Sequence, residues 1–151
     1  MEIIGISIST DTYNYGIIPL SSSVVSTGTI VTTNTGNVTE TYEVQGSSAI
    51  SAGKPPWTLS TSTGADKFCL YAIFNSIVPQ KTDFLDADDQ LKYTNESGSD
   101  TQFAINSSTY TGAGIPKSET RNVWFFLKMP STTSTSAEKT ITVTITAGES
   151  P

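Results

Sequence analysis

Apolar side chains recur at every second position along much of the chain, a pattern typical of β-strands rather than helices. Gly, Pro, Asn and Asp interrupt this alternation at short intervals and mark turns. The clearest alternation lies near the two ends, over residues 3–9 and 140–147. Further strands are expected over residues 25–33, 38–44, 67–75 and 123–129. The pattern predicts an all-β protein of about seven to nine short strands and no long helix.

Two of the expected strands, residues 67–75 and 123–129, are apolar at odd and even positions alike. Both faces of such a strand must be covered, one by the second sheet and the other by an insertion or a neighbouring subunit. The polar stretch between them, residues 78–121, is the natural cover because it carries scattered apolar residues. These are Phe84, Leu85, Leu91, Tyr93, Phe103, Ile105 and Tyr110.

The tetrapeptide Asn34-Thr35-Gly36-Asn37 is a strong turn signal, because Asn and Gly adopt positive φ at low cost. With strands on both sides, it predicts a β-hairpin. Residues 47–56 are expected to form a loop of small residues, and residues 86–91 one short helical turn. Together these elements predict a single immunoglobulin-like, jelly-roll-like β-sandwich over residues 1–151, with a long polar insertion.

The composition is rich in hydroxyls and poor in charge: 21 Ser and 25 Thr among 151 residues, 15% charged residues and a net charge of −6. The chain has no His, which removes the commonest general base and neutral metal ligand, and we expect no enzymatic activity. The lone Cys69 lies mid-strand and is expected to be a small buried hydrophobe. An acidic chain without a long apolar run is expected to bind no nucleic acid and to insert into no membrane.

A surface coated with Ser and Thr in place of Lys and Glu is typical of secreted proteins. Met1–Gly5 lacks the basic start and long apolar core of a signal peptide. We therefore expect a mature or recombinant form of an extracellular, cell-surface protein.

An acidic cluster offers the one candidate metal site, and no other cofactor is expected. Calcium takes six to eight oxygen ligands, and closely spaced carboxylates on a loop supply several of them. The candidate ligands are Asp83, Asp86, Asp88 and Asp89. The alternative is a solvated loop in which Asp88 and Asp89 cap a helical turn.

Glycans are possible partners in two ways. Three Asn-x-Ser/Thr sequons fall in expected turns or loops, at Asn37, Asn95 and Asn106. Aromatic side chains near turns are the usual platform for sugar rings, and the candidates are Trp57, Tyr13, Tyr15 and Tyr110. Trp57 follows two prolines and could equally plug the end of the sandwich.

The two terminal strands lack the features that normally protect a sheet edge. Natural edges carry Lys, Pro or bulges, whereas residues 3–9 and 140–147 carry Ser and Thr. A free N-terminal strand, within residues 1–10, that adds to the sheet of the next subunit makes a head-to-tail contact and hence a filament. The predicted interface residues are Ile3, Ile4, Ile6, Ile8, Ile141, Val143 and Ile145.

Two parts of the chain resemble known surface modules. Residues 16–19 (GIIP) and 30–42 (IVTTNTGNVTETY) resemble the hairpin of bacterial and archaeal immunoglobulin-like surface modules, and residues 115–125 (IPKSETRNVWF) and 141–147 (ITVTITA) resemble their closing strands. The layout is also similar to the camelysin and biofilm-fibre protein family and to archaeal bundling pili. This resemblance implies a homopolymer built by donation of the N-terminal strand.

The first hypothesis is therefore a non-enzymatic extracellular subunit that assembles into a surface filament or pilus-like fibre. The alternatives are a carbohydrate-binding or adhesive surface module and a virion decoration protein.

Overall fold

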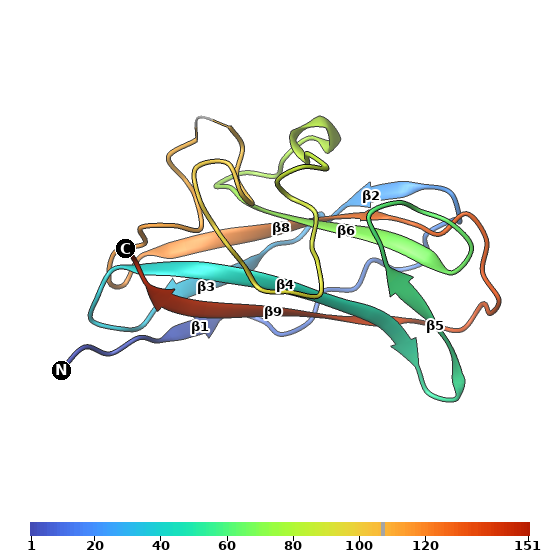
Figure 1. Ribbon diagram of the computed structural model, residues 1–151, viewed down its shortest axis with the longest axis horizontal. Helices are drawn as coiled ribbons and strands as arrows, with labels where there is room; N and C mark the ends of the chain where they lie inside the picture. The colour runs from blue at the N-terminus through green and yellow to red at the C-terminus, as the bar shows by residue number, and fades with distance from the viewer. Residues whose placement is uncertain (107) are drawn as a thin grey trace.

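The computed structural model describes residues 1–106 and 108–151 and shows an all-β protein, as predicted (Figure 1). Nine strands form one mixed sheet that folds over on itself and nearly closes into a barrel. The strands are β1 Ile6–Ile8, β2 Ser23–Val25, β3 Ile30–Asn34, β4 Glu40–Ser51, β5 Lys54–Leu59, β6 Lys67–Phe74, β7 Glu96–Ser97, β8 Thr120–Lys128 and β9 Thr140–Glu149. The one helical element in the described ranges is the 3₁₀ turn η1, Lys81–Asp83, and no helix there is long and apolar enough to cross a membrane.

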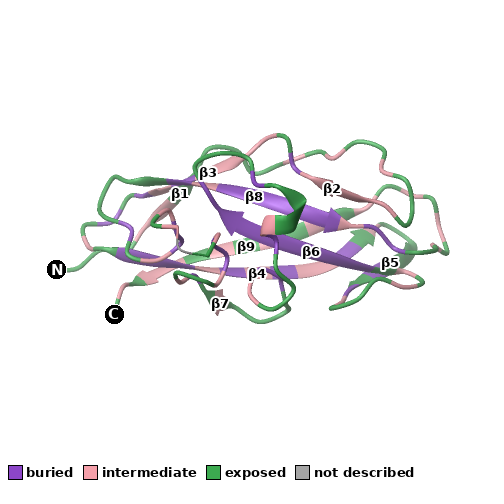
Figure 2. Ribbon diagram, turned by 90° about the horizontal axis from the view of Figure 1, so that it is seen from above, coloured by how far each residue is buried: buried purple, intermediate pink, exposed green. Residues whose placement is uncertain are grey.

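The strands lie in two layers that face each other (Figures 1 and 2). One layer has the order β1-β3-β8-β6, with β2 beside the second half of β8. In the other layer β4 pairs with β9 along one edge and with β5 and β7 along the other edge. All these pairs are antiparallel. A short parallel pair, Thr58 with Lys67 and Leu59 with Phe68, joins β5 to β6 and connects the layers.

Strands β6 and β8 are buried on both faces, which confirms the interpretation of their sequence. One set of side chains points into the main core between the layers: Phe68, Leu70, Ala72, Phe74, Val123, Phe125 and Leu127. The alternate set forms a second cluster on the outer face of the same strands: Cys69, Tyr71, Ile73, Trp124 and Phe126. Figure 2 shows the two strands as buried ribbons in the middle of the molecule.

Residues 78–121 serve both faces of β6. Phe84 belongs to the outer cluster, whereas Leu91 and Phe103 are buried in the main core. The backbone follows the edge of β6 that β8 leaves free, because the N–H of Leu91 donates to the carbonyl of Leu70 at 2.8 Å. The segment therefore covers the outer face and also closes the wall between β6 and β4.

The predicted hairpin around residues 34–37 is wrong, because β3 and β4 lie in different layers and do not pair. The turn itself exists. The Asn34 side-chain carbonyl accepts the Gly36 N–H at 2.8 Å, and its amide donates to the carbonyls of Val38 and Ile115 at 2.8 and 2.9 Å. These bonds stabilise a crossing from one layer to the other instead of a return along the same sheet.

Three other segments differ from the expectation. The predicted strand over residues 25–33 is divided into β2 and β3, because Val25 lies opposite Phe126 and Ile30 opposite Val123, so residues 26–29 are too many for the two residues of β8 between those pairs. The expected loop over residues 47–56 lies mostly in β4 and β5, which pair where Ala49 meets Trp57. In place of the helical turn expected over residues 86–91, residues 86–89 form a hydrogen-bonded turn, after which the chain runs along the edge of β6.

Truncation of Leu91 tests whether residues 78–121 are part of the core. Leu91 is 2% exposed in the main core, and Leu91→Ala is expected to lower the free energy of unfolding by about 2–5 kcal/mol. Leu85 is 37% exposed in the same segment, so Leu85→Ala is the matched control and is expected to cost under about 1 kcal/mol. Urea denaturation measures both, and equal costs would contradict this account of the segment.

Candidate functional site: the terminal strands

The N-terminal segment lies along β3 and then along the turn that follows β3. Strand β1 is antiparallel to β3, with Ser7 opposite Thr33. The pairing continues beyond β1, because the N–H of Thr35 donates to the carbonyl of Gly5 at 2.8 Å and the N–H of Asn37 donates to the carbonyl of Ile3 at 2.9 Å. Within the described ranges, β1 pairs along one edge only. Figure 1 shows the N-terminus at one end of the molecule, with β1 following it toward the middle.

The side chains of this segment contribute little to its attachment. Ile3, Ile4 and Ile8 are each 48% exposed. Of the predicted interface residues on the segment, Ile6 alone packs against the main core, where it is half-buried. Backbone hydrogen bonds are therefore the main link between the N-terminal segment and the rest of the chain.

Strand β9 presents the other predicted interface residues differently. It pairs with β4 from Glu40 to Ile50 with one irregularity, and its second edge pairs with no strand that the structure describes. Its apolar side chains are half-buried against the main core: Ile141, Val143 and Ile145. Its hydroxyl side chains are exposed: Thr140, Thr142, Thr144 and Thr146. The β9 edge therefore offers backbone groups flanked by Thr.

A buried carboxylate lies where the N-terminal segment meets β4. Glu40 is 0% exposed, and its Oε1 accepts the Gly5 N–H at 2.7 Å. Beside it on the same face of β4, Tyr42 is also fully buried, and burial followed by the nearby Glu40 charge raises the pKa of Tyr42 to about 12. Sequence reasoning missed this contact, although Glu40 shares the alternation of Tyr42 and Val44 and therefore faces the core.

The structure does not bring the predicted calcium ligands together. These carboxylates are Asp83, Asp86, Asp88 and Asp89. Asp83 accepts the N–H of Gln80 at 2.7 Å and caps η1. Over residues 1–106 and 108–151, no group of three or more His, Cys, Asp or Glu side chains is placed to hold a metal ion.

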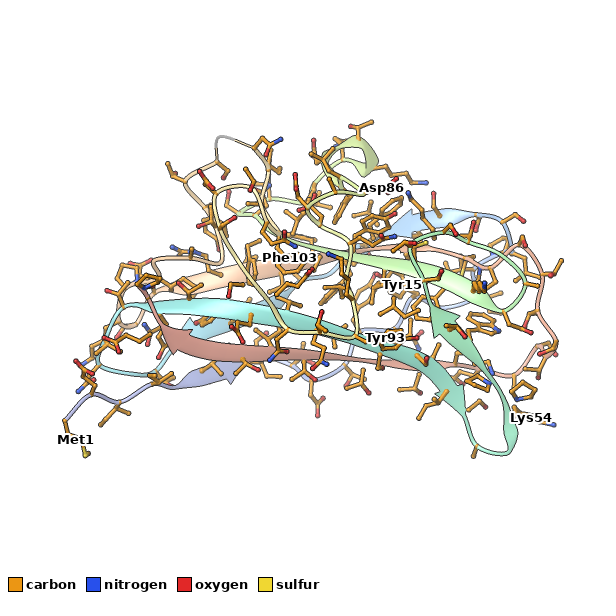
Figure 3. The ribbon with its side chains drawn as sticks, viewed as in Figure 1. Met1, Tyr15, Lys54, Asp86, Tyr93 and Phe103 are labelled. Carbon is orange, nitrogen blue, oxygen red and sulfur yellow. The ribbon has the colours of Figure 1, made fainter. Side chains whose placement is uncertain are left out.

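Asp86 instead ties its loop to the outer face of β6 and β8 (Figure 3). The Tyr71 hydroxyl donates to Asp86 Oδ1 at 2.5 Å, and Lys128 Nζ lies 3.1 Å from the same oxygen. The Tyr71 hydrogen bond and then the Lys128 contact lower the pKa of Asp86. Because Lys128 Nζ also lies 4.7 Å from the centre of the Tyr71 ring, the three side chains form one clasp over the outer cluster.

Asp89 is the buried member of the acidic cluster. It is 0% exposed, and its Oδ2 accepts the N–H of Leu85 at 2.7 Å. Its Oδ1 has no hydrogen-bond partner in the part of the chain that the structure describes. Burial raises the pKa of Asp89 to about 7, because removal from water penalises the charged form.

Cys69, Trp57 and Tyr110 each contact other parts of the chain. Cys69 is 1% exposed in the outer cluster, which confirms it as a buried hydrophobe, and burial raises the pKa of its thiol. Trp57 is 9% exposed, and its indole N–H donates to Thr133 Oγ1 at 2.8 Å. The Tyr110 hydroxyl accepts the N–H of Asn122 at 2.9 Å. Trp57 therefore supplies no exposed sugar platform.

The three sequon asparagines, Asn37, Asn95 and Asn106, are exposed, and glycosylation stays a prediction. The third sequon includes Ser107, which lies outside the described residues. Asn37 is also part of the N-terminal contact, because its Oδ1 accepts the N–H of Ile3 at 2.7 Å and its amide donates to the carbonyl of Met1 at 3.0 Å.

Asp89 predicts a pH dependence of stability. The folded-state pKa of about 7 lies above the usual 3.8, so folding retains a proton that the unfolded chain releases. This stabilisation is present below pH 3.8 and is lost as the pH rises through 7. Asp89→Asn stays neutral, so we expect the wild type to lose stability relative to this variant from about pH 4 to 8, by at most on the order of 4 kcal/mol.

Urea denaturation of the two proteins across this pH range measures the difference. Asp86→Asn is the control, because the pKa of Asp86 is lowered and its effect has the opposite sign. A constant difference between the wild type and Asp89→Asn across the range would contradict the burial of a titrating Asp89.

The Cys69 thiol is predicted to be unreactive in the folded protein. Its burial and raised pKa both suppress the thiolate, so a thiol reagent such as DTNB should react slowly in buffer at pH 7. In urea the same thiol should react fully. Immediate stoichiometric labelling of the folded protein would show that the outer face of β6 is open.

Comparisons with protein-family models, with curated proteins and with solved structures found no match to this chain. The structural features that bear on function are the free edges of β1 and β9 and the contact of the N-terminal segment with Glu40.

Proposed function

We propose that the protein is a non-enzymatic structural subunit that assembles with copies of itself into an extracellular surface filament or pilus-like fibre, by donation of its N-terminal strand. The observation that carries the proposal is the pair of unprotected edges. In the described part of the chain, β1 and β9 each pair on one side only, and residues 3–9 and 140–147 contain no Pro and no charge. Such edges accept another strand.

The weak attachment of β1 supports its role as the donor. Three of the four isoleucines in residues 3–8 are about half exposed, and residues 9–22 separate β1 from β2. A strand held mainly by backbone hydrogen bonds exchanges one set of such bonds for an equivalent set in another molecule. The isoleucines that it leaves in water here gain free energy when a neighbour covers them, at roughly 25 cal/mol per Å² of buried apolar surface.

The proposed contact permits a fibre. The donor strand and the edge that accepts it are different surfaces of one chain, so the contact is heterologous, and a subunit that receives a strand from one neighbour can donate its own strand to a third subunit. Such contacts propagate unless the rotation between subunits closes a ring. The hydroxyl-rich surface supports an extracellular location, where solubility is maintained with few charges.

The finer fold assignment is also a proposal. Two antiparallel layers packed face to face over a main core support an immunoglobulin-like sandwich. The parallel β5–β6 pair and the crossing between β3 and β4 are variations on that arrangement.

Electron microscopy of the purified protein tests the proposal. We expect fibres from the wild type and none from a variant that lacks residues 1–9, with circular dichroism to verify that this variant folds. Ile8→Lys keeps the full chain and adds a charge to the exposed side of β1, so it should also suppress fibres.

Ile50→Lys is the matched control, because Ile50 is 60% exposed near the end of β4, away from the N-terminal segment, and should leave fibres intact. Fibres formed by the deletion variant, or a wild type that stays monomeric at every concentration tested, would overturn the proposal.

A further inference from the structure

The turn after β3 and the start of β4 hold the N-terminal segment as a protein holds a peptide ligand. Four backbone or amide hydrogen bonds link residues 1–5 to Thr35 and Asn37, at 2.7–3.0 Å. The fifth is the bond from the Gly5 N–H to Glu40 Oε1. We name the surface formed by residues 35–37 and Glu40 the strand-binding corner.

Glu40 makes the corner costly to leave empty. Its carboxylate is fully buried, its Oε2 has no partner, and the Gly5 N–H is its one hydrogen-bond donor among residues 1–106 and 108–151. If the Gly5 N–H left, this carboxylate would have neither water nor a hydrogen-bond donor, which is unfavourable for a buried polar group. The corner is therefore stable when a strand occupies it, whichever molecule supplies that strand.

Two glycines lie where the N-terminal segment meets the corner. A Cβ on Gly36 would lie 2.3 Å from the Ile3 carbonyl oxygen and 2.5 Å from Glu40 Oε1. A Cβ on Gly5 would lie 2.8 Å from Thr35 Oγ1. The Gly36 backbone therefore lies too close to the segment for any side chain, whereas a side chain at position 5 would meet the Thr35 hydroxyl, because the nearest backbone atom, the Gly36 nitrogen, would lie 3.5 Å away. Gly5 is the one glycine in residues 1–10, so a shift of the strand by one or two residues would place a side chain against the Thr35 hydroxyl.

We infer that the strand-binding corner is the acceptor site for the N-terminal segment of a second copy of this chain, which it takes in the register that the chain's own segment shows here. The occupant is Met1–Ile8, with Gly5 over Gly36 and its N–H on Glu40. This inference rests on the proposed function. It names the site where the donated strand binds and the residues that recognise the strand.

The test uses two full-length variants that cross-link only across molecules. Ser7→Cys and Thr33→Cys lie opposite each other in the β1–β3 register. Each is made in a Cys69→Ser background, and the two proteins are mixed and treated with a short thiol-reactive cross-linker. A chain's own segment competes at an effective concentration in the millimolar range, so the mixture is held at about 1 mM protein.

We expect a cross-linked dimer of Ser7→Cys with Thr33→Cys on a denaturing gel. Val31→Cys is the register control, because it lies two residues away on the same strand and face, and it should give several-fold less product with Ser7→Cys. Gly5→Ala added to the donor chain should reduce the product several-fold while the acceptor chain stays unaltered. Gly148→Ala in the donor is the matched glycine control, since a Cβ there would have no neighbour closer than 3.9 Å.

The outcomes separate this inference from the proposed function. Fibres in the wild type without the Ser7–Thr33 cross-link, or with equal products from Thr33→Cys and Val31→Cys, overturn the corner as acceptor but leave the filament proposal. A register-specific cross-link that Gly5→Ala weakens, in a protein that forms closed dimers and no fibre, supports the corner and overturns the filament. If Gly5→Ala leaves the amount of cross-linked dimer unchanged, the proposal that Gly36 and Glu40 recognise Gly5 of the donated strand is overturned.

Discussion

The pairing of β6 with β8 is the constraint on which the rest of the structure depends. Six consecutive residue pairs, from Cys69–Lys128 to Phe74–Val123, join two strands whose side chains are apolar on both faces. Such a pair is stable only when both faces are removed from water, because each exposed aromatic side chain would forgo about 1.5–3 kcal/mol of burial. The β4–β9 layer covers one face. The other face, together with the edge of β6 that β8 leaves free, must be covered by another part of the chain.

Residues 78–121 meet that requirement, and the manner in which they do so explains the fate of the acidic cluster. Phe84 enters the outer cluster, while Leu91 enters the main core a few residues later. The backbone between them must therefore turn tightly over the edge of β6. Asp89 holds this turn by accepting the Leu85 N–H and Asp86 ties it to Tyr71, so the carboxylates are spent on separate bonds rather than gathered around a cation.

Some of this could be predicted from residue patterns and some could not. Successive side chains of β6, such as Phe68 and Cys69, point to opposite faces of the sheet, and this pattern can be seen in a short stretch of sequence. It correctly indicated which residues share each face and that the outer face needs a cover. The hairpin at Asn34 was wrong because the same Asn-Gly turn chemistry serves a return within a sheet and a crossing between layers. In the candidate site, alternation over residues 4–9 correctly places Ser7 and Ser9 outward, but it does not predict that Ile4 and Ile8 are about half exposed. Nor does it predict the Glu40–Gly5 contact, because that contact joins residues 35 positions apart.

The sequence by itself determined the all-β class, the two-faced central strands, the buried Cys69 and the unprotected character of both terminal strands. Each depends on the order of neighbouring side chains, which the period of a strand converts directly into faces and edges. Only the tertiary structure decided that β3 and β4 lie in different layers, that residues 78–121 split between two clusters, and that Gly5 meets Glu40 over Gly36. These features depend on which distant segments share a small space, and close packing selects among alternatives that are locally equivalent.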